Sequence, residues 1–457
     1  MYDIADHKKI GEFARKRFGN TYTGNLMESL KTHIAPEVEQ TDEFVPLLNT
    51  RPDQKGEPIY LDLSYETLGG GTPIVVFAVQ GSGKTVFILN FVEELIKSNY
   101  TVVNLSDVKN DAYYATGRLQ SQFRKFLPPW KWSRLYDSTN APLEVKCYTP
   151  EFAARNNNPL KLHTFQLDIS NFSADDIIKS FFKLRSEDDP QARIIRRVYN
   201  YVFKNRPPST VMELMNAIQN VNNIPTDENT PRSFYSPASI HTLNDKIDLY
   251  RNEGIFGEQY SVDFIQDMLD KKYVSFCLNN ETRESAKSKL QAYISALIWK
   301  IYREKVSGRL KTKKIVEIFD DASEIAYPPR KIPSSKSSIQ AMTRIGRDKW
   351  IFPVVISQSV TELGRQLINK ARYVIFFTGI SGSDLEFLAK ERMTDYGMIL
   401  DYFEQGKGPQ RIQDGEYAGA RSVLIWVNDG SHNGKGKIIR GWVGMPSCSI
   451  PLPKMGG

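Results

Sequence analysis

Residues 72–86 constrain the fold of this chain more than any other segment. They begin with an apolar run from Pro73 to Val79, pass through the turn Gln-Gly-Ser-Gly, and lead through Lys-Thr into an apolar helical pattern. A strand, a glycine-containing loop and a helix in this order are the context of a phosphate-binding P-loop. Glycines let successive backbone N–H groups turn towards an anion, and the helix N-terminus adds a partial positive charge. The segment therefore predicts an α/β core that binds a nucleotide.

The residues of this loop have distinct expected roles. Lys84 can reach the β- and γ-phosphates of ATP, and the hydroxyl of Thr85 can ligate Mg²⁺. Ala78 stands where the pattern usually has its first glycine, and because alanine is also small this is a minor departure. We expect ATP to contact the loop and the start of the helix, which are Gln80, Gly81, Ser82, Gly83, Lys84, Thr85 and Val86.

Composition limits the class of protein but leaves its partner open. The 457 residues are 40% hydrophobic and 25% charged, as in ordinary soluble globular proteins, and no apolar stretch is long enough to span a bilayer. The first residues do not resemble a signal peptide, so we expect a cytoplasmic protein, or one acting in the cytoplasm of a host. The net charge of +7 permits contact with nucleic acid and fits a merely soluble surface equally well. Cys147, Cys277 and Cys448 are far apart in the sequence, which favours reduced structural thiols.

Apolar segments downstream of the P-loop alternate between strand and helix lengths. Their alternation indicates a parallel sheet covered by helices on both faces. Residues 170–270 instead show only helical spacing, which indicates an all-helical insertion. Strands are predicted at 100–105, 273–278, 314–319, 353–357, 373–378 and 422–427. We expect an N-terminal helical arm and linker (1–55), a P-loop half of the core (56–169), the helical insertion (170–270), a second half of the core (271–440) and a C-terminal tail (441–457).

The strand predicted at 314–319 is followed by two carboxylates, Asp320 and Asp321. This is the form of a Walker B motif, because residues at the carboxyl ends of parallel strands face the ligand crevice of an open α/β sheet. Asp320 would hold Mg²⁺, directly or through water, and Asp321 would polarise the attacking water. Related ATPases usually have glutamate at the second position, so Asp321 acts over a longer reach or Glu324 assists it. The alternative is that the two aspartates only begin a solvated turn.

Three more polar residues flank the strand predicted at 353–357. Gln358 follows it and could bond the γ-phosphate or the lytic water, although a glutamine at this place is usually just a turn residue. Arg344 and Arg347 precede it, and they are either surface charges or arginine fingers that reach the ATP of a neighbouring subunit.

Together these motifs resemble the HerA/FtsK superfamily of ring-forming DNA-pumping ATPases, and within it the archaeal HerA-like branch. The resemblance runs over about residues 58–426, apart from portions of the helical insertion. It is carried by the P-loop, by the Walker B strand and by the block 344–371 that contains Gln358. Residues 107–111, Asp-Val-Lys-Asn-Asp, also look like the family's Asp-Pro-Lys-Gly-Glu turn.

The resemblance implies a RecA-like P-loop core in a homo-oligomer, a hexameric ring, with double-stranded DNA in its pore. Basic segments at 300–314 and 330–336 could line this pore, although each also fits a solvated loop. Little chain precedes the P-loop for the β-barrel of cellular HerA proteins, which favours a relative from a virus, plasmid or other mobile element. Nuclease, capsid or DNA-transfer machinery would then be a further partner.

Two other classes of protein remain open. One is a secretion or assembly motor that acts on proteins without nucleic acid, and the other is a nucleotide-binding scaffold in which Asp321 has replaced the catalytic glutamate. For an active motor we expect Lys84→Ala to abolish ATP turnover and to leave the fold intact.

Overall fold

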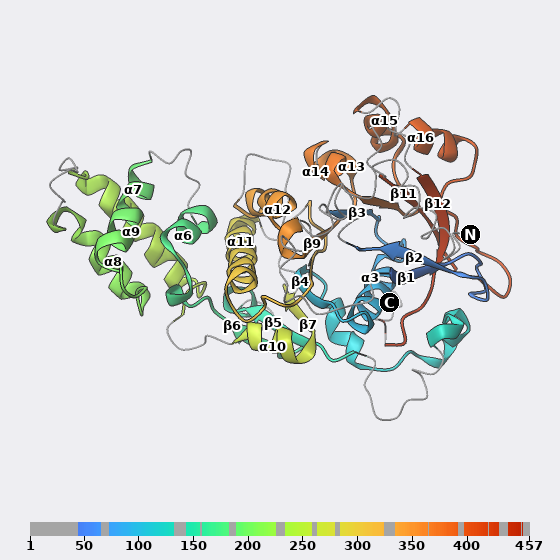
Figure 1. Cartoon of the computed structure of the whole chain (residues 1–457), viewed down its shortest axis with the longest axis horizontal. Coiled ribbons are helices and arrows are strands. Elements are labelled where there is room, and N and C mark those ends of the chain that lie inside the picture. Colours follow the sequence, from blue (N-terminus) through green and yellow to red (C-terminus); the bar gives the residue numbers. More distant parts are fainter. Residues whose placement is uncertain are drawn as a thin grey trace, which may run out of the picture.

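One large sheet organises the chain (Figure 1), and its twelve strands follow the order β2-β1-β12-β11-β10-β3-β9-β8-β4-β7-β5-β6. Four parts of the predictions lie outside the residues that the structure describes: the arm up to residue 43, Glu324, residues 330–333 of the second basic segment, and the last seven residues. The computed structural model describes residues 44–64, 73–131, 143–155, 158–181, 189–224, 234–257, 263–278, 284–323, 334–363, 365–391, 397–418, 420–428, 437–448 and 450.

Every neighbouring pair of strands from β10 to β6 is parallel, as the alternation of strand and helix patterns predicts. In spatial order these strands are β10 (Tyr373–Phe376), β3 (Ile74–Phe77), β9 (Ile351–Ser357), β8 (Ile315–Phe319), β4 (Thr101–Asp107), β7 (Tyr273–Cys277), β5 (Lys146–Pro150) and β6 (His163–Phe165).

Four antiparallel strands extend the sheet beyond β10: β11 (Ser422–Val427), β12 (Lys437–Val443), β1 (Phe44–Asn49) and β2 (Pro58–Asp62). Two predicted segment ends therefore need correction. β1 falls in the predicted arm and linker (1–55), yet its Val45, Leu47 and Leu48 side chains are buried and its Leu47 carbonyl accepts a hydrogen bond of 2.9 Å from Asn90. β12 crosses the predicted start of the tail at 441, because it pairs along its length with β11.

Helices cover both faces of the sheet. Alternate residues of β3 enter two separate cores, with Val75 and Phe77 on one face and Ile74 and Val76 on the other. The second core is closed by α3 (Lys84–Lys97), the helix that follows the P-loop. The first is closed by α10 (Phe264–Lys271), α11 (Glu284–Val306) and α12 (Ser334–Ile345), together with the helices after β9 and β10. The predicted α/β class, a RecA-like P-loop core with its sheet covered on both faces, is confirmed.

The other α-helices outside the predicted insertion are short and lie in the connections between strands. The α-helices are α5 (Glu151–Ala154), α13 (Val360–Leu363), α14 (Arg365–Lys370), α15 (Gly382–Glu391) and α16 (Gly397–Glu404). The 3₁₀ turns are η1 (Asp111–Thr116), η2 (Ser121–Phe126), η3 (Pro129–Lys131), η4 (Ile169–Asn171), η5 (Val221–Asn223) and η6 (Arg347–Lys349). No helix in the described ranges is both long and apolar enough to cross a membrane.

In the segment predicted as an all-helical insertion (170–270), the elements that the structure describes are helices, apart from a bridge residue at Phe256. Helices α6 to α9 form a lobe that extends away from the sheet beyond α11 (Figure 1), whereas α10 packs against the sheet. The chain leaves the core and returns to it at one place, where Leu167 and Phe256 form a β-bridge. The lobe helices are α6 (Ala174–Phe181), α7 (Pro190–Tyr201), α8 (Val211–Gln219) and α9 (Pro237–Asn252).

Candidate active site

The P-loop joins β3 to α3 at the carboxyl edge of the parallel strands. Ser82 N–H donates to the Val79 carbonyl at 3.1 Å, which closes a turn that has Gly81 at its third position with φ of 77°. Gly83, with φ of 99°, directs the chain into the helix. Both conformations are left-handed and favour glycine. Ala78, in contrast, is not among the described residues with positive φ, so alanine is unstrained where the usual pattern has glycine.

The Walker B aspartates lie beside this loop, on the same side of the sheet. β9 separates β3 from β8, and the long side chain of Lys84 bridges the gap. Its Nζ lies 2.8 Å from Asp320 Oδ1 and 2.6 Å from Asp321 Oδ1. Gln358, which follows β9, donates from Nε2 to Asp321 Oδ1 at 3.3 Å. The structure thus brings together four of the predicted residues from three parts of the sequence.

Asp321 has a backbone conformation that is uncommon for a residue other than glycine. Its φ is 44°, and its N–H donates to Asp320 Oδ1 at 2.8 Å. The next residue, Ala322, donates its N–H to the Ile356 carbonyl of β9 at 2.8 Å, which fixes the turn to the sheet. Left-handed residues of this kind concentrate at functional sites, and here the conformation places the carboxylate against Lys84.

Burial and charge act in opposite directions on these three ionisable groups. Burial would lower the pKa of Lys84, but Asp320 and Asp321 outweigh it and hold that pKa above its ordinary value. Burial raises the pKa of Asp320 above its ordinary value, although Lys84 opposes this. Burial would also raise the pKa of Asp321, but the charge of Lys84 and the hydrogen bond from Gln358 hold it below its ordinary value.

Two more carboxylates join the site from the end of β4, and sequence reasoning did not include them. Thr85 Oγ1 donates to Asp111 Oδ2 at 2.6 Å. Asp107 caps the turn at residues 107–112, because its carboxylate accepts hydrogen bonds from the N–H groups of Asp111 and Ala112 at 2.9 and 3.0 Å. Burial, with the charge of Asp111, raises the pKa of Asp107 to about 7. The available signal was the resemblance of residues 107–111 to a family turn, combined with the adjacency of β4 to the Walker B strand.

The donors at this site suit a nucleotide with Mg²⁺. Within the described ranges, no group of His, Cys, Asp or Glu side chains forms a metal site by itself. Mg²⁺ at nucleotide sites needs few protein ligands, because phosphates and waters complete its shell, and Thr85, Asp111 and Asp320 offer hard oxygen atoms. Ser82 Oγ is buried in the loop and has no hydrogen-bond partner in the described part of the protein, so a phosphate oxygen could satisfy it.

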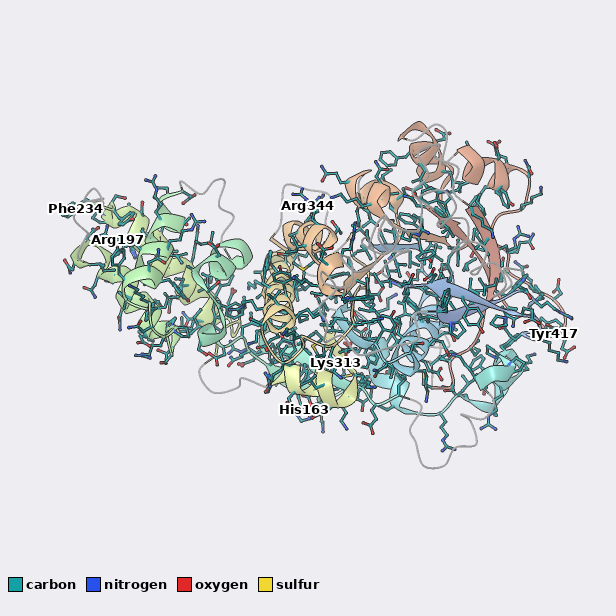
Figure 2. All side chains as sticks on the ribbon, in the orientation of Figure 1. His163, Arg197, Phe234, Lys313, Arg344 and Tyr417 are labelled. Carbon is teal, nitrogen blue, oxygen red and sulfur yellow. The ribbon has the colours of Figure 1, made fainter. Side chains whose placement is uncertain are left out.

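The two predicted finger arginines lie elsewhere. Arg344 is exposed near the C-terminal end of α12 (Figure 2), and Arg347 is half-buried in η6. Both precede β9, whereas Gln358 follows it, so they are at the opposite edge of the sheet from the P-loop. Within one chain they do not join the site.

Part of the basic segment 300–314 is used inside the protein. Lys305 is buried and donates to the Lys311 carbonyl at 2.6 Å. Lys314 is also buried, with its Nζ 4.1 Å from the centre of the Trp350 ring. Lys313, in the same segment, is half-buried (Figure 2). The segment therefore presents fewer free cations than its composition suggests.

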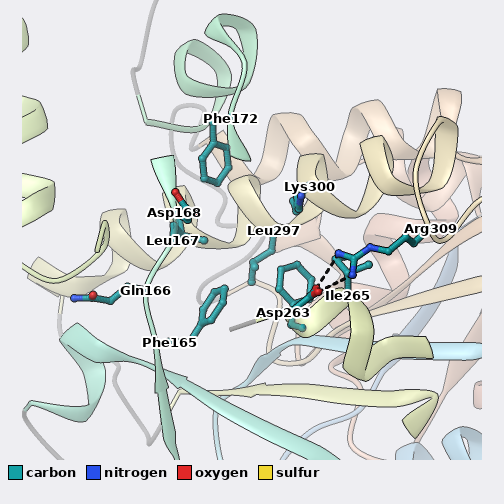
Figure 3. A pocket seen from close by; sticks show the side chains of 11 residues that line it. Phe165, Gln166, Leu167, Asp168, Phe172, Asp263, Ile265, Leu297, Lys300 and Arg309 are labelled. Carbon is teal, nitrogen blue, oxygen red and sulfur yellow. Dashed lines mark hydrogen bonds and ion pairs between the residues drawn. The ribbon is translucent and has the colours of Figure 1, made fainter. Parts of the chain in front are cut away.

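A separate cavity of about 230 Å³ lies at the base of the lobe (Figure 3). Its two cations are already paired, since Arg309 forms two hydrogen bonds of 2.6 and 2.8 Å with Asp263, and Lys300 binds Glu304 at 2.8 Å. Much of the remaining lining of the cavity is aromatic or aliphatic and includes Phe165, Phe172, Phe264 and Leu297. It is not part of the phosphate site.

Comparison with known proteins places the chain in a family. The profile described as "Helicase HerA, central domain" matches residues 71–348, and no curated protein matches the chain. Among solved structures, VirB4 of Thermoanaerobacter pseudethanolicus is 14% identical, with a TM-score of 0.49 over 91% of this chain and 98% of that one. The plasmid coupling protein TrwB, in complex with a non-hydrolysable GTP analogue, is 10% identical, with a TM-score of 0.48 over 91% and 97%.

A third structure is the genome packaging NTPase B204 from Sulfolobus turreted icosahedral virus 2, in complex with ATP-gammaS. It is 15% identical, with a TM-score of 0.26 over 40% of this chain and 72% of that one. These structural likenesses are distant. The family profile, in contrast, spans more than half of the chain and includes both the P-loop and the Walker B aspartates. The chain therefore belongs to the HerA central-domain family and is a P-loop ATPase of the HerA/FtsK type.

Proposed function

We propose that this protein is an ATP-driven motor that forms a ring and translocates double-stranded DNA. The observation that carries the proposal is the convergence of Lys84, Asp320, Asp321 and Gln358 beside the P-loop. A phosphate-binding lysine, a metal-binding carboxylate, a second carboxylate and a polar sensor are the parts that nucleotide hydrolysis requires. The family match supports a motor that acts on DNA.

In this proposal ATP is held by residues 80–86. Lys84 leaves the carboxylates of Asp320 and Asp321 and binds the phosphates instead. Mg²⁺ neutralises charge on the phosphates when bound, and Thr85, Asp320 and Asp111 would hold it. Asp321 accepts a proton from the attacking water, and Gln358, already bonded to Asp321, orients that water.

In a ring of subunits, the two distant arginines could contact the ATP of a neighbouring subunit. Because Arg344 and Arg347 are at the edge of the sheet opposite to the P-loop, they could reach only the ATP of a neighbouring subunit. A hexamer with sites at subunit interfaces, as the family resemblance implies, makes hydrolysis in one subunit depend on the next. The biological settings that fit are genome packaging, DNA transfer or end processing in a cytoplasm, with nuclease, capsid or transfer machinery as partners.

The test is the dependence of ATPase activity on double-stranded DNA and on salt. Basic pore residues that contact phosphates bind without sequence preference and release counter-ions, so DNA should stimulate turnover at low salt, and stimulation should fade as salt rises. Lys84→Ala should remove both basal and stimulated turnover. Turnover in that variant would refute the site, whereas turnover that ignores DNA at every salt concentration would refute the DNA motor alone.

A motor that acts on proteins is the second candidate. It is favoured by the burial of Lys305 and Lys314, which removes two cations from a segment that could have lined a DNA pore. An active ATPase that DNA does not stimulate would support this candidate. If the protein bound ADP but released no phosphate from ATP, it would instead be an inactive scaffold.

A further inference from the structure

Arg421 reaches the P-loop from a part of the chain that none of the motifs includes. It precedes β11, which runs antiparallel to β10, so its position lies at the edge where β10 and β3 end. From there its Nη1 donates a hydrogen bond to the carbonyl oxygen of Gly81. A Cβ atom built on Gly83 would come within 3.0 Å of the Arg421 side chain, so the guanidinium lies directly against the loop.

This contact controls the orientation of one peptide in the loop. The C=O of Gly81 and the N–H of Ser82 belong to the same planar peptide and point in opposite directions. Holding the carbonyl outward therefore keeps the Ser82 N–H on the inner side of the turn, where it donates to the Val79 carbonyl at 3.1 Å. The loop is also braced from β10, since a Cβ on Gly379 would come 2.5 Å from Val79.

Arg421 also brings positive charge to the loop. In the described part of the chain it forms no ion pair, and its backbone forms a β-bridge with that of Arg411. Burial, together with the charge of Arg411, lowers the pKa of Arg421 below its ordinary value. Two neighbouring cations form an environment that an anion would stabilise.

We propose that Arg421 is a positioning residue for nucleotide binding, which holds the P-loop turn through the Gly81 carbonyl and raises the affinity for phosphates. The proposal rests on the proposed function only in requiring that a nucleotide occupies the P-loop. Because Arg421 contacts the outer side of the loop, it should affect binding rather than the hydrolytic step.

The experiment compares Arg421→Gln and Arg421→Lys with a matched control, Arg440→Gln. Arg440 is on β12, opposite Leu424 of β11, and donates to the Gly408 carbonyl at 3.0 Å, so its loss removes a similar bond away from the loop. For each protein one measures the Kd for ATP-gammaS and ADP by titration calorimetry, the KM and kcat for ATP, and the melting temperature without nucleotide.

We expect Arg421→Gln to weaken nucleotide binding about tenfold and to raise KM similarly, with kcat within about twofold of the unmodified protein. Arg421→Lys should recover much of the affinity, because an ammonium can also donate to the carbonyl, and Arg440→Gln should bind normally. Unchanged affinity in Arg421→Gln, equal weakening in Arg440→Gln, or a loss confined to kcat would each overturn the proposal. Absence of binding in the unmodified protein would instead overturn the proposed function.

Discussion

Lys84 is the counter-ion of two buried aspartates as well as the proposed ligand of ATP phosphates. Its removal should therefore affect more than turnover, and the expectation from sequence that the fold of Lys84→Ala stays intact needs a qualification. The variant should fold to the same structure but lose about 3–5 kcal/mol of stability near neutral pH, because two carboxylates are left without their cation. Chemical denaturation without nucleotide measures this loss.

The pH dependence of that loss of stability follows from the directions in which the pKa values of the aspartates are shifted. In the unmodified protein the pKa of Asp321 is lowered, so its stabilisation is present above its ordinary pKa and disappears as the pH falls. Without Lys84 the carboxylates should retain protons in the folded state, so the variant should lose stability as pH rises. The difference between the proteins should thus be larger at pH 8 than at pH 5. The control is Lys97→Ala, because Lys97 is exposed on the same helix. If Lys84→Ala were as stable as the unmodified protein at pH 8, the stabilising role of the ion pair would be contradicted.

Asp111 offers a test of the proposed Mg²⁺ site that does not depend on turnover. In Asp111→Asn the amide oxygen can still accept the Thr85 hydroxyl, but the charge is lost. Affinity for ATP-gammaS in the presence of Mg²⁺ should fall about tenfold, while affinity for ADP without metal should change little. The melting temperature without ligand should rise, because repulsion with Asp107 is removed. A variant with unchanged affinity in the presence of Mg²⁺ would show that Asp111 only supports the Thr85 hydroxyl.

At the scale of single elements, the Walker B strand contains a carboxylic acid that the site does not use. Glu317 is at the centre of β8, between Val103 of β4 and Pro353 of β9, and neither of its carboxyl oxygens has a hydrogen-bond partner in the described part of the chain. Burial raises the pKa of Glu317 to about 8. An acid with a raised pKa is held neutral by the fold, so stability should fall as pH rises from its ordinary pKa towards 8.

Glu317→Gln should therefore stabilise the protein only at high pH. Glutamine has the size of the neutral acid and cannot ionise. The free energy of unfolding of the variant should therefore match that of the unmodified protein at pH 5 and exceed it by roughly a few kcal/mol at pH 9. Urea denaturation at both pH values provides the measurement. Equal stabilisation at both values would mean that Glu317 is not protonated by burial.

The elements that sequence predicts well are those with a strong local pattern. The P-loop strand is apolar through its length, the Walker B strand is apolar except for Glu317, and the predicted helical insertion has clear helical spacing. β1, β5, β6 and β12 were not predicted. β1 contains Pro46 next to a register shift, and β6 has only three residues. Arg421 and Asp111 were missed as site residues for a related reason, since each joins the loop through strand order, which local periodicity does not encode.

At the scale of the whole molecule, the lobe and the arginines before β9 are far from the phosphate site of their own chain. The lobe was predicted as an insertion, and it extends beyond α11 (Figure 1). Leu167 and Phe256 form a β-bridge at its base, and its helix α6 contacts α11 and α12. A hydrolytic site in the core does not require such a lobe, nor does it use arginines at the far edge of the sheet. Both features are understandable if the functional unit contains several copies of the chain.

Mixing two inactive variants tests this shared site directly. Lys84→Ala subunits lack the phosphate lysine, and subunits with both Arg344→Ala and Arg347→Ala lack the proposed fingers, so each protein alone should be inactive. In a ring of randomly mixed subunits, roughly a quarter of the interfaces should combine an intact P-loop with a neighbour that has both arginines. ATPase activity should then recover to about that fraction of the unmodified protein.

The matched control mixes Lys84→Ala with Asp321→Ala. Both substitutions fall in the same half of the site, where Nζ and the carboxylate are 2.6 Å apart in one chain, so no combination of these subunits restores a complete site. Recovery in the first mixture and none in the second would establish arginines that act across the interface. If the double arginine variant is active alone, neither arginine is a finger. If the first mixture stays inactive while both variants enter mixed rings, the arginines do not act from a neighbouring subunit.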